Sequence, residues 1–382
     1  MVSSNNEVVN RDKYFMNEVL KLARKGEGSV SPNPLVGAVV VNNGEIVGRG
    51  FHEYYGGSHA EINALKDAGN KAKGGTLYVN LEPCSHRGKT PPCSLHVKEA
   101  GLKRIVIAMK DPNPIVAGRG ERYLREAGIE VTRGVLKKEA KRLNEVFIKY
   151  ITTDYPFVYL KTAQTADGFL ATASGESKWI TGEEARLEGH QLRNKVDGVL
   201  VGSGTVLADN PQLTTRLPDG KGKDSLRIIL DTYLKTPLEA KILSDDCEKK
   251  TLLVCAKKIY NEKKSKYSEV SNVEISPVPL NDMGLISIDD LLKELHKREI
   301  GSILVEGGGR INYSFLEKGF VDRLHMFIAP KLMGGSDGVS VFDGKGPVSM
   351  DEVMELYDTE YKILGEDLML TARVENAYSR VN

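Results

Sequence analysis

The chain has 382 residues, of which 40% are hydrophobic, and its 53 basic and 52 acidic side chains leave a net charge of +1. This balance excludes the electrostatic footprint of a nucleic-acid binder, and no apolar run is long enough to span a bilayer. The first residues lack the apolar core of a signal peptide, and four cysteines are too few for a disulfide scaffold. We therefore expect a cytoplasmic protein of two or three domains, without nucleic-acid or membrane partners.

Helix and strand signals alternate over the first 150 residues. Apolar residues at helical spacing predict a helix over 11–25, which Gly26 can end. Two apolar runs, 35–41 and 46–51, flank Asn43-Gly44, which is a hairpin signal. The remaining elements expected here are a helix from about Ser58, a strand at 74–81, a helix from about Cys93, and strands at 104–109 and 128–135.

The pattern restarts after about residue 152. A strand and turn at 157–171 precede a helix over 181–195, for which Thr181 and Glu184 form a capping-box pattern. The later elements expected are strands at 196–202, 226–231, 251–256, 272–276 and 322–335, a helix at 287–300, and a strand, glycine turn and helix over 302–319. Alternating strands and helices predict two α/β domains, 1–152 and 153–382.

The stretch "GGSHAEINAL" at 56–65 allows two interpretations. Ser58 and Glu61 fit the capping-box pattern, in which case His59 has no special role. Alternatively, His59 supplies one imidazole of a metal site and Glu61 serves as a nearby base.

Two cysteines favour the metal site. Cys84 follows a strand and a proline, and Cys93 opens a short helix, where a thiolate is stabilised. Together with His59 they make the open, three-ligand zinc layout of a hydrolytic enzyme, and Glu61 can shuttle the proton. The H-x-E and P-C…C pattern is typical of zinc nucleobase deaminases, although eight residues rather than two separate these cysteines.

Three alternatives remain for the cysteines. They can belong to a closed structural zinc site with His86 and His96, they can form a redox pair, or they can be unrelated. The strand–helix order places His59 and Cys93 at neighbouring helix starts, which favours the catalytic interpretation.

Three segments, "SPNPLVGAVVV", "GRGFHEYYGGSHAE" and "EPCSHRGKTPPC", closely resemble the deaminases of riboflavin biosynthesis, in which the long spacer is usual. "SKWITG", "VGSGTVLADNPQLTTR" and the triple glycine resemble the reductase fused to them. The resemblance covers nearly the whole chain. It implies a cytidine-deaminase-like three-layer domain followed by a dihydrofolate-reductase-like α/β domain, and a homo-oligomer.

The family resemblance also implies two consecutive reactions. The first is zinc-dependent hydrolytic deamination of 2,5-diamino-6-(5-phosphoribosylamino)pyrimidin-4(3H)-one. The second is NADPH-dependent reduction of the ribosyl chain, which gives 5-amino-6-(5-phosphoribitylamino)uracil. A chain with only one working site, a nucleic-acid-editing deaminase and a structural zinc module are the competing hypotheses. The presence of both motif sets weighs against a chain with only one working site. The near-zero net charge weighs against a nucleic-acid-editing deaminase.

For the deaminase, the resemblance assigns one zinc ion to His59, Cys84 and Cys93, and the proton shuttle to Glu61. Residues expected to contact the substrate are Asn33, His52 and Lys89. Simpler roles also exist for these three: a turn residue between two prolines, a surface histidine and a solvated lysine.

For the reductase, the resemblance assigns two groups of residues. NADPH is expected to contact Ala163, Trp179, Thr205, Asp209, Thr232 and Gly308. The substrate is expected to contact Lys161, Ser177, Arg193, Leu213, Arg216 and Glu306. Lys161 and Asp209 are proton-donor candidates by position only. Alternatives are a core position for Trp179, a solvated surface position for Arg193, and a plain tight turn for the glycines, which lack the dinucleotide fingerprint.

Overall fold

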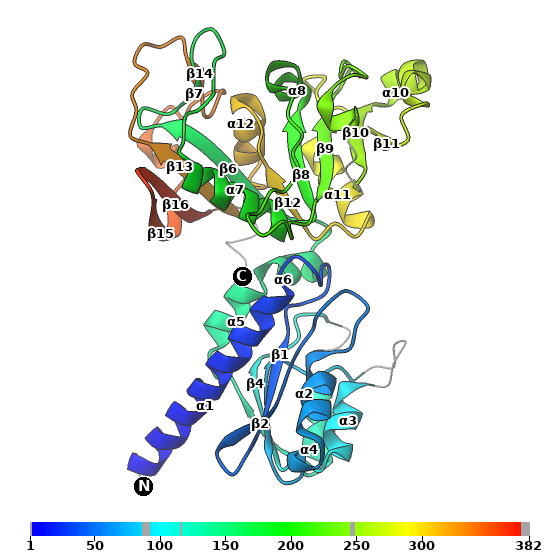
Figure 1. The fold of residues 1–382 in the computed structure, drawn as a ribbon, viewed down its shortest axis with the longest axis vertical. Helices are drawn as coiled ribbons and strands as arrows, with labels where there is room; N and C mark the ends of the chain where they lie inside the picture. Colours follow the sequence, from blue (N-terminus) through cyan, green and yellow to red (C-terminus); the bar gives the residue numbers. More distant parts are fainter. Residues whose placement is uncertain (1, 86–91, 115–116, 245–248, 376–382) are drawn as a thin grey trace. The chain divides into compact units, whose positions relative to one another are not determined.

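A computed structural model describes residues 2–85, 92–114, 117–244 and 249–375. The chain divides into two compact units, 1–154 and 155–382 (Figure 1). Within the described ranges, no helix combines the length and apolar character needed to cross a membrane.

The first unit is built on a five-stranded sheet of order β2-β1-β3-β4-β5. Its strands are β1 (Gly37–Asn42), β2 (Glu45–Phe51), β3 (Thr76–Leu81), β4 (Arg104–Met109) and β5 (Glu130–Arg133). The pairs β1–β2 and β1–β3 are antiparallel, and β3, β4 and β5 run parallel. Asn43 and Gly44 both have positive φ, 52° and 84°, so the expected hairpin turn is present.

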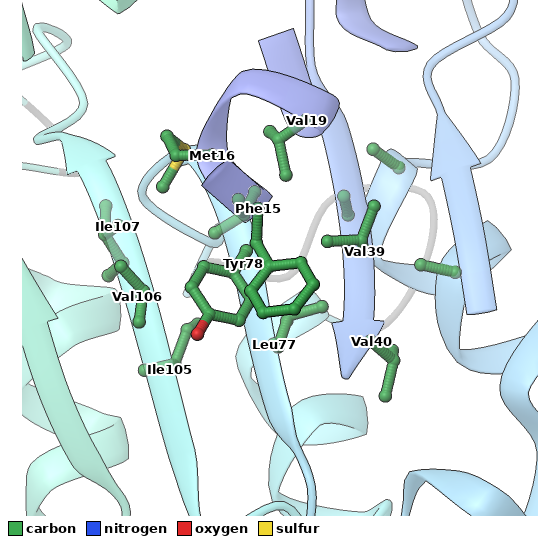
Figure 2. Packing of buried hydrophobic residues seen from close by; sticks show 14 of the residues in the cluster. Phe15, Met16, Val19, Val39, Val40, Leu77, Tyr78, Ile105, Val106 and Ile107 are labelled. Atoms are coloured by element: carbon green, nitrogen blue, oxygen red, sulfur yellow. The ribbon is translucent and has the colours of Figure 1, made fainter. Parts of the chain in front are cut away.

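Helices cover both faces of this sheet and make three layers (Figure 1). They are α1 (Val2–Ala23), α2 (Ala60–Ala68), α3 (Cys93–Glu99), α4 (Arg119–Glu126), α5 (Lys137–Leu143) and α6 (Glu145–Thr152). In Figure 2, Phe15 and Val19 of α1 lie over Val39, Leu77 and Tyr78 of the sheet, and all five are buried. The predicted helix over 11–25 is therefore correct in its buried face but too short at its N-terminal end.

Two glycines of β2 let α2 lie directly on the sheet. A Cβ at Gly50 would come 2.4 Å from the Ala60 oxygen and the Ala64 nitrogen, and one at Gly48 would come 2.3 Å from the Ala64 oxygen. Any side chain at these positions would push α2 outward. The two glycines thus set the distance between β2 and the N-terminal end of α2, where His59 and Glu61 lie.

The second unit contains a nine-stranded sheet of order β11-β10-β9-β8-β12-β6-β13-β16-β15. Its strands are β6 (Phe157–Thr165), β8 (Gly198–Gly202), β9 (Leu226–Leu230), β10 (Thr251–Ala256), β11 (Val273–Val278), β12 (Ser302–Val305), β13 (Arg323–Ala329), β15 (Leu356–Leu364) and β16 (Asp367–Val374). The strands from β11 to β13 are parallel, while β16 and β15 are antiparallel additions. A small separate sheet pairs β7 (Phe169–Ala171) with β14 (Val339–Ser340).

Helices cover both faces of the parallel part. They are α7 (Glu183–Lys195), α8 (Ser203–Asp209), α9 (Lys241–Ser244), α10 (Lys257–Lys263), α11 (Ile288–Lys297) and α12 (Gly309–Glu317). Ala185 and Leu192 of α7 belong to one buried cluster, and Leu291 of α11 and Phe315 of α12 belong to the other. The strand order reverses around β12, which lies between β6 and β8. In open α/β sheets, ligands bind beyond the carboxyl ends of strands at such a point.

Both predicted capping boxes are wrong. The residue before α7 is Gly182 rather than Thr181, and its N–H donates to Asp367 Oδ2 of β16 at 2.6 Å. The residue before α2 is His59, and among the described residues no side chain caps that helix. At α7 the group that contacts the helix start is Asp367, which is distant in sequence. At α2 the residue at the helix start is His59, a candidate metal ligand.

Candidate active sites

The first unit brings His59, Cys84 and Cys93 into one cluster. His59 immediately precedes α2, Cys93 is the first residue of α3, and Cys84 lies in the loop after β3. His59 Nδ1 is 3.1 Å from Cys93 Sγ and 3.7 Å from Cys84 Sγ. All three candidate ligand atoms lie within 4.8 Å of one another.

The donor set fits zinc. Ligand atoms of a tetrahedral site with Zn–S and Zn–N bonds of ordinary length are separated by about 3.5–3.8 Å, close to the spacing found here. Among the described residues, His96 does not join this group, and its Nδ1 instead lies 3.6 Å from Glu99. His86 lies outside the described residues. Within the part of the chain that the structure describes, the arrangement has one imidazole and two thiols, as the open three-ligand form requires.

The pKa values of the two cysteine thiols shift in opposite directions. Hydrogen bonds from Cys93 and His59 lower the pKa of the Cys84 thiol to about 4. The hydrogen bond with Cys84 and burial raise the pKa of Cys93. The backbone N–H of Cys93, at the start of α3, also donates to Cys84 Sγ at 3.3 Å. A cation between these atoms would favour the thiolate form of both.

Glu61 is buried beside the cluster without being one of its ligand atoms. Only 3% of the residue is exposed, and it lies in the first turn of α2. Burial raises the pKa of its carboxyl, while neighbouring His59 opposes the shift. A buried carboxyl next to a metal site is suited to carry protons.

Asn33 and His52 are brought together at the same end of the unit. His52 Nδ1 lies 3.1 Å from the Ser58 carbonyl oxygen, so Nδ1 carries the proton and Nε2 accepts. The Asn33 Nδ2 amide donates to that Nε2 at 3.2 Å. The His52 ring is 5.7 Å from that of His59, and burial lowers its pKa. The surface alternative for His52 is wrong, since the residue is only 3% exposed. Lys89 lies outside the described residues.

The second unit contains a cavity of about 940 Å³ at the carboxyl ends of β6, β8 and β12. The residues expected to bind NADPH or substrate in the reductase all line it: Lys161, Ala163, Ser177, Trp179, Arg193, Thr205, Asp209, Leu213, Arg216, Thr232, Glu306 and Gly308. The topology thus collects into one cavity residues that lie far apart in the chain.

A buried charge cluster lies at the cavity wall. Arg193 donates to both carboxylate oxygens of Glu306, at 2.6 and 2.8 Å, and to the Thr214 oxygen at 3.1 Å. Lys161 Nζ lies 3.7 Å from Glu306 Oε2. Although burial acts in the opposite direction, the two cations lower the pKa of Glu306 to about 2. The solvated-surface alternative for Arg193 is wrong, and its guanidinium is held in a bidentate pair.

His190 belongs to this cluster and was missed from the sequence. Its Nδ1 accepts from the Arg216 backbone N–H at 3.2 Å. Burial, with Arg193 and Arg216 nearby, lowers its pKa to about 4, so the ring is neutral. Its position three residues before Arg193 on α7, on the same helix face, was the available signal.

Trp179 lies at the outer part of the cavity. The residue is 67% exposed, so the core alternative is wrong. The Arg186 guanidinium lies 4.5 Å from the ring centroid, and Lys331 Nζ donates to the Trp179 and Ile180 carbonyl oxygens at 2.8 and 2.7 Å. Asp209 accepts from Ser177 at 3.4 Å. These contacts hold an aromatic surface against which a ring can stack.

The three consecutive glycines at the start of α12 are needed for different reasons. A Cβ at Gly309 would come 2.2 Å from the Ser340 oxygen, and one at Gly307 would come 2.7 Å from Ile311. A Cβ at Gly308 would meet its nearest atom, Thr205 Oγ1, only at 4.0 Å. Packing therefore explains the outer two glycines, and open space toward the cavity explains the middle one.

Two family models match this chain. Residues 9–109 match the cytidine and deoxycytidylate deaminase zinc-binding region, and residues 156–370 match the RibD C-terminal domain. Riboflavin biosynthesis protein RibD of Aquifex aeolicus is 47% identical over 94% of this chain and 97% of its own length. The Bacillus amyloliquefaciens protein of the same name is 45% identical over 94% of this chain and 96% of its own length.

Two solved structures resemble the whole chain. RibD of Acinetobacter baumannii has a TM-score of 0.86 and 34% identity, covering 96% of this chain and 100% of that one. A diaminohydroxyphosphoribosylaminopyrimidine deaminase/5-amino-6-(5-phosphoribosylamino)uracil reductase of Thermotoga maritima has a TM-score of 0.83 and 38% identity, covering 96% and 99% of the two chains.

Proposed function

This chain belongs to the RibD family of bifunctional riboflavin-biosynthesis enzymes, and on that premise we propose which of its residues perform each reaction. It is a zinc-dependent deaminase of the diaminopyrimidine substrate and an NADPH-dependent reductase of the ribosyl chain. We assign the deaminase to residues 1–152 and the reductase to residues 153–382. The two family matches, 9–109 and 156–370, fall on either side of that boundary.

In the deaminase, His59, Cys84 and Cys93 would hold the zinc ion. When bound, zinc supplies the acidity that makes water a nucleophile near neutral pH. Glu61 takes a proton from the attacking water and returns one to the departing amino nitrogen. The observation that carries this assignment is a buried carboxyl beside the three-ligand cluster but outside it.

Substrate recognition in the deaminase falls to Asn33, His52 and Lys89. Because His52 anchors the Asn33 amide N–H, the amide carbonyl is oriented to accept from an amino group on a pyrimidine edge. Lys89 is assigned to the substrate phosphate, as its charge suggests.

In the reductase, Trp179, Thr205 and Gly308 would hold NADPH in the part of the cavity that they line. When bound, it supplies the hydride that opens the ribosyl ring at C1. Ala163, Asp209 and Thr232 complete the set proposed to contact the cofactor. Trp179 presents a fixed ring face, and the unobstructed Gly308 lets the cofactor approach the chain closely.

The charge cluster holds the phosphosugar. Glu306 orients Lys161 and Arg193, and with Arg216 the cluster carries a net positive charge suited to a phosphate. Ser177 and Leu213 complete the proposed substrate set. We assign the proton donor to Lys161 rather than Asp209, because burial lowers the Lys161 pKa and so eases proton release.

The cofactor assignment is tested by the fluorescence of Trp179, which is the only tryptophan in the chain. Adding NADPH to the full-length protein is expected to quench this emission in a saturable way, because the nicotinamide cofactor absorbs where tryptophan emits. Thr205→Val should shift the midpoint to a higher NADPH concentration without changing the emission of the free protein. Unaltered emission at NADPH concentrations that support reduction would place the cofactor elsewhere.

We further propose that the chain acts in the cytoplasm as a homo-oligomer. The zinc ligands include two thiols, which stay reduced in that compartment. Association is supported by the family resemblance.

A further inference from the structure

The backbone that carries Trp179 is held by two cations from different parts of the second unit. Lys331 Nζ donates to the carbonyl oxygens of Trp179 and Ile180, at 2.8 and 2.7 Å. The next carbonyl oxygen along the chain, that of Thr181, accepts from Arg186 Nη1 at 2.8 Å. Three successive carbonyl groups are therefore bonded to positively charged side chains, and such bonds are stronger than those between neutral groups.

Lys331 differs from Arg186 in its position relative to the cavity. Arg186 belongs to α7, it lines the cavity, and its guanidinium also contacts the Trp179 ring. Lys331 follows β13 in the chain, and it is not among the described residues that line the cavity. An effect of Lys331 on a ligand in the cavity would therefore be transmitted through the backbone at Trp179.

The segment that carries Lys331 is itself fixed by its backbone. The Lys331 carbonyl oxygen accepts from the Ala166 N–H at 2.9 Å. Asp167, in the turn between β6 and β7, accepts from the N–H groups of Met333 and Gly334 at 3.0 and 2.8 Å. These bonds do not involve the Lys331 side chain. A substitution at this position can thus remove the ammonium group without releasing the segment.

The Trp179 side chain has little other support. The residue is 67% exposed, and it lies between β7 and α7, outside any helix or strand. An exposed side chain changes rotamer within nanoseconds unless contacts hold it. Ordering such a side chain when a ligand binds costs free energy, and a side chain that is already ordered in the free protein avoids that cost.

We propose that Lys331 is a positioning residue of the reductase, which orders Trp179 for NADPH before the cofactor binds. The identity of the ligand rests on the function proposed above, whereas the ordering of the ring does not. A ring that stacks on the cofactor contributes equally before and during hydride transfer. The loss of its ordering is therefore expected to raise the KM for NADPH and to leave kcat unchanged.

Lys331→Met tests this role, because it keeps the apolar stem of the side chain and removes its hydrogen-bond donors. Trp179 is the only tryptophan in the chain, so the decay of fluorescence anisotropy reports on this ring alone. In the full-length protein without NADPH, we expect the Met variant to show larger nanosecond motion than the wild type. The KM for NADPH should rise roughly threefold to tenfold, which corresponds to ordering one large side chain on binding. The kcat of reduction at saturating NADPH should equal that of the wild type, which also shows that the variant is folded.

Two further variants control this result. Lys331→Arg should restore both the anisotropy and the KM, because a guanidinium can also donate to two neighbouring carbonyl oxygens. Lys297→Met should match the wild type, since Lys297 is exposed at the last position of α11 and is not among the described residues that line the cavity.

The proposal is overturned if the Trp179 ring of the Met variant is as ordered as that of the wild type, or if the KM for NADPH does not change. An Arg variant that behaves like the Met variant would also overturn it. Titration of the wild type with NADPH separates these outcomes from failure of the proposed function. Wild-type emission that NADPH leaves unaltered would contradict the cofactor assignment on which the proposal rests.

Discussion

Replacing Glu61 with Gln is expected to slow deamination by roughly 10²–10⁴-fold, the usual contribution of a general acid–base group. The Gln amide matches the carboxyl in size but can neither take the water proton nor return one to the leaving nitrogen. Zinc content and reduction of the deaminated intermediate should be unchanged, because Glu61 is not among the three clustered ligand atoms. Ammonia release and metal analysis on the same preparation measure both quantities.

Glu99→Gln is the control for this result. Glu99 lies on α3, close to the site in sequence, and its carboxylate is exposed beside His96. Its rate should equal that of the wild type. If E61Q keeps most of its activity, or loses zinc in proportion to activity, Glu61 has a structural role instead.

The second large effect concerns the metal. His59→Ala should reduce zinc from one ion per chain to a small fraction of one and abolish deamination, because two thiols alone do not complete the site. Reduction of 5-amino-6-(5-phosphoribosylamino)uracil by NADPH should continue at the wild-type rate. That separation follows from placing the two reactions in different units.

His96→Ala distinguishes the catalytic site from a closed structural one. His96 lies outside the ligand cluster of the described residues, so its removal should leave zinc and deamination intact. Loss of zinc from the His96 variant, with retention in the His59 variant, would reverse the assignment.

The deaminase cluster was predictable because each ligand lies at the end of an element that the sequence marks clearly. The β3 run ends just before Cys84, and two prolines precede the helix that Cys93 opens. The local capping pattern at Ser58 was misleading, since Glu61 is buried beside the cluster and no described side chain caps α2. Local patterns describe a helix start well only when no distant group competes for it.

The residues that line the reductase cavity were harder to predict from local sequence patterns. Glu306 and Arg193 form their bidentate pair across 113 positions, and only the order of strands brings them together. These residues were predicted from the family resemblance, whereas the strands were predicted from the hydrophobic pattern alone. The β15–β16 hairpin was missed altogether, and β15, which is exposed on both faces, has no buried alternation to detect.

The most direct test of two reactions in one chain is mass spectrometry of the phosphoribosyl-diaminopyrimidinone incubated with zinc-loaded, full-length protein, with and without NADPH. Without NADPH, the amino group should be replaced by a carbonyl and nothing else should change. With NADPH, two further hydrogens should appear in the product. Deamination that NADPH does not extend would contradict the reductase assignment, and an unchanged substrate would contradict the zinc site as the deaminase centre.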